Sequence, residues 1–168
     1  QDVGGRVLAE KPVEVSEEEI RRCAASFEGE QLQVPPMYSA RKVNGKRLYE
    51  LAREGQVVER TPGKVHIYQL EILSIQLPRV KLRIRCSAGT YLRTLCHDMG
   101  EKLGCGGCME HLLRTRVERF GVLDARKLSQ VQMYADHGKV QLLILPPDRM
   151  FEEYAAVKTR EKGCLLYT

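Results

Sequence analysis

Two side chains suited to chemistry, Tyr91 and Arg93, follow a turn of small residues at positions 87–89. The apolar spacing after this turn predicts a helix capped by Thr90, with Tyr91 and Arg93 in its first turn. A helix N-terminus is already positive, because its backbone N–H groups point outward and the macrodipole adds to them. We therefore expect an anion to compensate Arg93, either an RNA phosphate or a carboxylate from elsewhere in the fold. The alternative is an ordinary surface arginine.

A second group of side chains suited to binding lies between Pro35 and Arg53. This stretch has five basic residues and one acidic residue, Glu50. Cations that meet phosphates and aromatic rings that contact bases are typical of RNA-binding surfaces. Such a run is also typical of a solvated face, and charge by itself does not decide between the two. The basic residues of this stretch are Arg41, Lys42, Lys46, Arg47 and Arg53.

Helices and a loop are predicted around this stretch. Ser16 and Glu19 form a capping box, which predicts a helix from Glu17 to Phe27. Pro35-Pro36 and Asn44-Gly45 predict an exposed loop or ribbon over 34–45, followed by a short helix over 46–54.

Two strands are predicted next, over 64–74 and 80–86. In the second, apolar residues alternate with Lys81, Arg83 and Arg85, so one face is apolar and the other is basic. We add Arg83 and Arg85 to the candidate RNA-binding residues. Further helices are expected over 108–113 and 128–135, and the apolar run 140–145 is either a strand or a buried connector. This order of elements favours an α+β fold with a mixed, largely antiparallel sheet flanked by helices.

The composition fits a single folded, soluble domain. The chain has 168 residues, of which 43% are hydrophobic, and this is enough to form one core. Its net charge of +5 makes it mildly basic. No apolar run is long enough to span a membrane and the first residues do not resemble a signal peptide, so we expect a cytoplasmic protein without membrane contact. Six cysteines are expected as reduced thiols. Cys105 and Cys108 have CxxC spacing but lack a second ligand pair, so no metal site is expected.

Two long motifs resemble the bacterial TruB-type pseudouridine synthases. The stretch "VPPMYSARKVNGKRLYELAREG" is similar to the segment with which that family grips tRNA, and "CSAGTYLRTLCHDMGEKLGCGG" with "LLRTRV" is similar to its later active-site motif. The beginning, "QDVGGRVLAEKPV", also resembles the family. The resemblance covers roughly residues 1–151, which are expected to form the later part of the catalytic domain and to include a gripping segment at 29–60.

The resemblance implies a reaction. The family converts the T-loop uridine of tRNA to pseudouridine by breaking the C1′–N1 bond, rotating the flipped base and joining C1′ to C5, without cofactor or metal. Arg93 matches the arginine that pairs with the catalytic aspartate. Tyr91 matches a tyrosine near the flipped base, and Leu112 matches an apolar residue near the pocket. The resemblance also implies which residues bind RNA, because the following match the segment that closes on the tRNA stem-loop: Tyr38, Lys42, Lys46, Arg47, Tyr49 and Arg53. The implied partner is the T-arm stem-loop of tRNA, bound by a monomer.

The chain also departs from the family. The motif "GxLDPxAxG", which carries the family's catalytic aspartate, is absent from this sequence, so we expect no turnover by this chain alone. Ala88 stands where many members have a lysine. Residues 152–168 match no family pattern, and we expect a truncated or non-native tail without the PUA-type RNA-binding domain.

Two other functions remain open. Cbf5 or dyskerin, the guide-RNA-dependent relatives, share the "AGTYLRTLC" region, although the gripping segment favours the stand-alone type. A non-catalytic RNA-binding or RNA-chaperone module is the alternative from another class, and the basic strand face and loop would suffice for it.

Overall fold

The computed structural model describes residues 2–5, 7, 9–147 and 149. Its chain divides into two units, residues 1–112 and 113–168. The predicted tail at 152–168 lies outside the described residues. Among the described residues, no helix is both long and apolar enough to cross a membrane.

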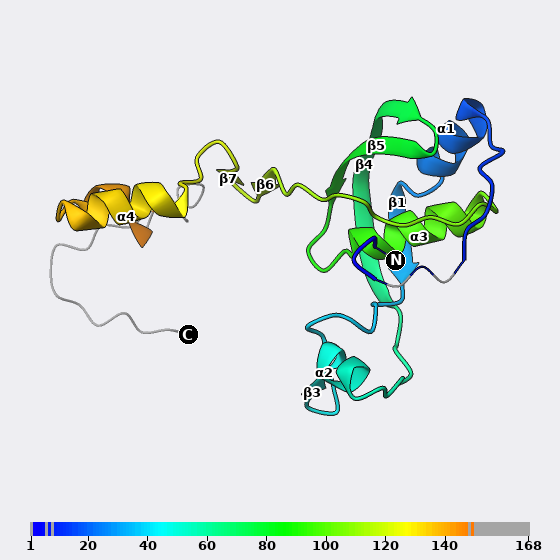
Figure 1. Cartoon of the computed structure of the whole chain (residues 1–168), viewed down its shortest axis with the longest axis horizontal. Helices are drawn as coiled ribbons and strands as arrows, with labels where there is room; N and C mark the ends of the chain where they lie inside the picture. The colour runs from blue at the N-terminus through cyan, green and yellow to red at the C-terminus, as the bar shows by residue number, and fades with distance from the viewer. Residues whose placement is uncertain (1, 6, 8, 148, 150–168) are drawn as a thin grey trace, which may run out of the picture. The chain divides into compact units, whose positions relative to one another are not determined.

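The first unit is built on a three-stranded antiparallel sheet in the order β1-β4-β5 (Figure 1). These strands are β1 (Gly29–Gln33), β4 (Gly63–Gln76) and β5 (Arg79–Cys86). Two helices, α1 (Glu17–Ala25) and α3 (Leu92–Lys102), contribute the residues that pack against it. The capping box predicted at Ser16 is present at the start of α1.

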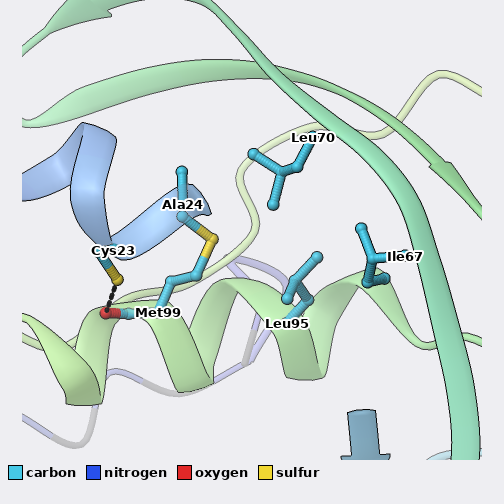
Figure 2. Packing of buried hydrophobic residues seen from close by; sticks show 6 residues of the cluster. All are labelled: Cys23, Ala24, Ile67, Leu70, Leu95 and Met99. Atoms are coloured by element: carbon cyan, nitrogen blue, oxygen red, sulfur yellow. Dashed lines mark hydrogen bonds between the residues drawn. The ribbon is translucent and has the colours of Figure 1, made fainter. Parts of the chain in front are cut away.

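The core lies between the two helices and the central strand (Figure 2). Ile67 of β4 and Leu95 of α3 are almost completely buried, and Cys23 of α1 donates its Sγ hydrogen to the carbonyl oxygen of Met99 at 3.7 Å. The apolar face of β5 contributes Leu82, Ile84 and Cys86 to the same layer, so the basic residues that alternate with them face outward.

The gripping segment, residues 29–60, begins with β1, and its residues 34–60 lie beyond the ends of β1 and β4 (Figure 1). It contains a small hairpin of β2 (Lys42–Val43) and β3 (Lys46–Arg47), followed by α2 (Leu48–Arg53). Asn44 and Gly45 turn the hairpin with φ of 51° and 82°, which those residue types tolerate best. Leu48 and Leu51 are buried, so the segment has apolar anchors of its own.

Within residues 113–147 of the second unit, the elements are short. These are β6 (Arg116–Val117), β7 (Phe120–Gly121), α4 (Leu128–Asp136) and the 3₁₀ helix η1 (Val140–Leu143). No residue of α4 or η1 is buried.

The predicted α+β fold with an antiparallel sheet is confirmed, as are the helices near 17–27, 46–54 and 128–135 and both predicted strands. Strand β1 was not predicted, because residues 29–33 show no alternation of apolar and polar side chains. Pro35 and Pro36 are buried, so the exposed loop predicted over 34–45 is partly wrong. Run 140–145 is mostly exposed and begins as a 3₁₀ helix, neither a strand nor a buried connector.

The helix predicted over 108–113 is also wrong. Met109 instead forms a parallel bridge with Asp2, and the N–H of Val3 donates to the Met109 carbonyl oxygen at 3.2 Å. This pairing keeps the segment extended. Thr90 is not the cap of α3, because its hydroxyl donates to the Ser87 carbonyl oxygen and Tyr91 occupies the N-cap position.

Candidate active site and RNA interface

Arg93 in the first turn of α3 has the anionic partner that the sequence predicted, and it is a carboxylate. Its Nη1 donates to Asp2 Oδ2 at 3.0 Å, and its Nη2 donates to the carbonyl oxygen of Tyr38 at 2.7 Å. The two side chains are 28% and 31% exposed. Arg93 therefore ties the first residues of the chain to the gripping segment, which makes it more than a surface arginine.

The electrostatics of the pair favour the charged state of Asp2. The hydrogen bond from Arg93 is the largest influence and holds the pKa of the Asp2 carboxyl below its ordinary value of 3.8, with further help from the backbone N–H of Gly4. A guanidinium has five N–H donors, and these two bonds use two of them. Those that remain are suited to a second carboxylate or a phosphate.

The position of Asp2 depends on a close approach between two backbones. Gly106 donates its N–H to the carbonyl oxygen of Gly100 in α3 at 3.0 Å. A Cβ on Gly100 would lie 2.1 Å from the Gly107 nitrogen, and a Cβ on Gly107 would lie 2.5 Å from the Cys96 carbonyl oxygen. Only glycine fits at both positions. The chain then runs on to Met109, which pairs with Asp2, so α3 indirectly places the carboxylate that its own arginine binds.

Tyr91 occupies the N-cap of α3, and its side chain makes no capping hydrogen bond. The backbone of Tyr91 is bound instead by the side chain of Gln33, the last residue of β1. Tyr91 was predicted from the sequence as a site residue, whereas Gln33 and Asp2 were not. Asp2 stood inside the family-like stretch "QDVGG", which was the one signal for it, whereas no pattern pointed to Gln33.

The predicted residue Leu112 is 48% exposed, at the end of the first unit. The ring of Tyr38 is 60% exposed, although its carbonyl oxygen binds Arg93. The structure therefore brings Tyr91, Arg93 and the backbone of Tyr38 together. The role of Leu112 stays a prediction.

Two cations of the gripping segment, Arg47 and Arg53, lie close to the ring of Tyr49. Arg47 donates from Nη1 to the Tyr49 hydroxyl at 2.9 Å, and its guanidinium lies 5.8 Å from the ring centroid. Arg53 lies 5.4 Å from the same centroid. Lys46 Nζ is 3.8 Å from Glu54 Oε2. Stacked arginines lose less conformational freedom on binding a phosphate than free ones, so Tyr49 serves here as a support for two cations.

The two basic residues proposed on β5 also have neighbours. Arg83 pairs with Glu71 Oε2 at 3.0 Å, and the Arg85 guanidinium lies 5.5 Å from the centre of the Tyr68 ring. Tyr68 in turn is tilted against His66 with ring centroids 4.7 Å apart. Both arginines are exposed on the face away from the core. Glu71 partly offsets the charge there, so this face is less uniformly basic than β5 predicts by itself.

Two recesses among the described residues are lined by side chains other than Arg93 and Asp2, and the larger has the following lining: Arg126, Gln130, Tyr134, Leu142 and Leu143. In the part of the chain that the structure describes, no group of three or more His, Cys, Asp or Glu side chains is placed to hold a metal ion. A recess of about 40 Å³ lies among Gln33, Asp98 and their apolar neighbours, which is room for about one water molecule. The candidate site is therefore the partly exposed cluster around Arg93.

Comparison with solved structures gives the class of protein first. The chain is similar to a chain in the crystal structure of a Cbf5–Nop10–Gar1 complex, with a TM-score of 0.63 and 28% identity over 82% of this chain and 39% of that one. It is also similar to a chain in the structure of an H/ACA RNP bound to a substrate RNA containing 2′-deoxyuridine, with a TM-score of 0.53 and 26% identity over 74% and 32% of the two chains. The fold is that of the pseudouridine synthases.

Sequence comparison then gives the family. Residues 1–92 match the N-terminal domain of TruB family pseudouridylate synthases, and residues 93–152 match the tRNA pseudouridylate synthase B C-terminal domain. The chain belongs to the TruB family, as the motifs predicted. It is 40% identical to tRNA pseudouridine synthase B of Clostridium tetani over 95% of this chain and 54% of that protein. The match in Clostridium novyi is 51% identical over 71% and 41%. The chain thus spans about half the length of these relatives.

Proposed function

We propose that the protein converts the T-loop uridine of tRNA to pseudouridine, as a cytoplasmic monomer that binds the T-arm stem-loop. The observation that carries the proposal is the double attachment of Arg93 to Asp2 and to the Tyr38 carbonyl oxygen. It joins the active-site helix to a segment rich in cations. Family membership supports the same reaction.

In this reaction Arg93 binds an anion while Asp2 fixes its orientation. The guanidinium donors not used by Asp2 and Tyr38 pair with the carboxylate that attacks the uridine, keeping it ionised and directed. Tyr91, two residues before Arg93, lies beside the flipped base. The attacking aspartate is the one that the family carries in "GxLDPxAxG", which residues 1–168 do not contain.

The gripping segment and Arg83 and Arg85 hold the RNA. Lys42, Lys46, Arg47 and Arg53 meet phosphates of the T-arm, and the exposed ring of Tyr38 contacts a base or sugar. Leu112 packs close to the base. Base flipping needs such a hold on the flanking strands, because unstacking a nucleotide costs a few kcal/mol.

The test measures tritium release from tRNA labelled at uridine C5, because the isomerisation replaces the C5 hydrogen. The full coding sequence that contains residues 1–168 should release tritium, whereas the 168-residue chain should release none. A full-length protein that releases no tritium would refute the proposal. Turnover by the 168-residue chain would show that another residue replaces the missing aspartate.

Two other functions are separated by the same samples. A non-catalytic RNA-binding module would bind a T-arm hairpin with a steep salt dependence, and the full-length protein would show no turnover. The likeness to the Cbf5 complex favours a guide-dependent synthase as the second candidate. That enzyme would act only when a guide RNA and accessory proteins are added.

A further inference from the structure

Gln33 makes two hydrogen bonds to the backbone of one residue across 58 positions of sequence. Its Nε2 donates to the carbonyl oxygen of Tyr91 at 3.0 Å, and its Oε1 accepts the N–H of Tyr91 at 2.7 Å. This is the pairing that two strand residues normally make with each other. The side chain is 6% exposed, so water competes little for either bond.

Tyr91 needs such a partner because helix α3 begins without a cap of its own. Its N-cap side chain accepts no hydrogen bond from the first turn. The carbonyl oxygen of Tyr91 already accepts the N–H of Leu95 at 3.1 Å, and Gln33 uses its other lone pair. The start of α3 is thus held by the end of β1 rather than by its own sequence.

Gln33 also stands at the base of the RNA-gripping part of the chain. In the sheet it pairs with Gly63 of β4, so the sheet fixes its backbone, and the segment that carries Tyr38 leaves the sheet directly after it. The start of α3 therefore has two links to this region, Gln33 to the Tyr91 backbone and Arg93 to the Tyr38 carbonyl oxygen. The two links are made by residues of the same helix turn, Tyr91 and Arg93.

We propose that Gln33 is a positioning residue of the active site: its side-chain amide holds the backbone of Tyr91 and thereby directs Arg93 toward Asp2. This inference rests on the proposed function only for its effect on catalysis. Its effect on geometry belongs to the 168-residue chain and is measured separately.

The geometric test uses Gln33→Met, which has a similar length and makes neither hydrogen bond, and Gln33→Glu, which keeps an acceptor but has no donor when ionised. In the 168-residue chain, we expect the amide of Tyr91 to exchange with solvent at least about tenfold faster in Gln33→Met. The amide of Ile72 in β4 should change less than about threefold. The titration midpoint of the Asp2 carboxyl should rise toward 3.8. Gln69→Met, an exposed change in the same sheet, is the control.

The catalytic test uses the full coding sequence. Gln33→Met should lower kcat by about tenfold or more and leave KM for tRNA within about threefold, because misorientation affects the chemical step more than RNA affinity. The kcat of Gln33→Glu should lie between the kcat of Gln33→Met and that of the unaltered protein. If Gln33→Met does not fold, Gln33→Glu is the variant that tests the proposal.

Two results would overturn the positioning role. One is an unchanged Tyr91 amide and Asp2 titration in both variants. The other is equal acceleration of the Tyr91 and Ile72 amides, which indicates general destabilisation. If the unaltered full-length protein makes no pseudouridine, the proposed function fails, and the exchange and titration data still decide the role of Gln33.

Discussion

Arg93 and Asp2 form an ion pair at 3.0 Å although 91 residues separate them in the chain. The same guanidinium binds the Tyr38 carbonyl oxygen at 2.7 Å. One side chain therefore links residue 2, the gripping segment and helix α3. Because the pair joins three parts of the chain at one guanidinium, we ascribe to it the orientation of Arg93.

Removing either partner should lower turnover far more than RNA affinity. In the full-length protein, Arg93→Ala should reduce kcat by about 10²-fold or more, since it deletes a positioned charge at the reacting centre. Asp2→Asn keeps the shape and loses the charge, and it should reduce kcat less. Tritium release and tRNA binding are measured on the same samples. Arg79→Ala, which breaks the exposed pair with Glu110 at 3.0 Å, is the control. Equal losses of kcat and affinity would contradict the assignment.

The ion pair also predicts a pH dependence. Arg93 lowers the pKa of Asp2 below 3.8, so the folded chain binds a proton at Asp2 less readily than the unfolded chain. The pair therefore contributes its stabilisation fully above pH 3.8, and the contribution is lost as the pH falls through the lowered pKa. A carboxyl-carbon NMR titration should give a midpoint below 3.8 in the native chain and nearer 3.8 in Arg93→Gln. Arg79→Gln should leave the midpoint unchanged, and an ordinary midpoint in the native chain would argue against the pair.

The glycine contact should be intolerant of a single methyl group. In Gly107→Ala the new Cβ meets the Cys96 carbonyl oxygen at 2.5 Å, so the segment must shift away from α3. We expect a loss of roughly 1–3 kcal/mol in the free energy of unfolding, together with a rise in the Asp2 titration midpoint as Met109 moves. Gly5→Ala, where the nearest atom lies at an ordinary 3.8 Å, is the matched change. Urea unfolding of both variants decides the point, and equal stabilities would exclude the close approach.

The core gives a prediction independent of function. Ile67 is 1% exposed among α1, α3 and the central strand. Ile67→Ala should lower the free energy of unfolding by roughly 2–5 kcal/mol, because it removes apolar contacts and leaves a cavity. Leu73→Ala on the same strand should cost much less, since Leu73 is 37% exposed. If denaturant curves show similar losses for the two variants, the core is misplaced.

The parts of the fold and of the site that could be predicted from the sequence depend on interactions between residues close together in the chain. The alternation in 80–86 and the capping box at Ser16 are local patterns, and both elements formed as predicted. Strand β1 was missed because its burial runs against its polarity: Leu32 is exposed, whereas Gln33 is buried. The helix expected over 108–113 did not form, because Met109 pairs with Asp2, which lies more than 100 residues earlier in the chain. The need of Arg93 for an anion was a local deduction, whereas the identity of its partner required the fold.

The gripping segment should bind RNA through phosphates, and this can be tested one cation at a time. Titration of a T-arm hairpin at several salt concentrations gives the slope of log affinity against log salt. This slope is negative, and its magnitude decreases by about 0.7–0.9 for each phosphate contact removed. Lys42→Ala should decrease the magnitude of the slope by the amount expected for about one phosphate contact. Lys64→Ala, whose side chain pairs with Glu30 at 2.9 Å in the sheet, should leave it unchanged. Tyr49→Leu tests the aromatic support, because Arg47 and Arg53 both lie over that ring. It should weaken binding with little change in slope, since both charges remain while their ordering is lost. A slope whose magnitude decreases equally in the Lys42→Ala and Lys64→Ala variants would mean that the RNA responds to net charge and not to this segment.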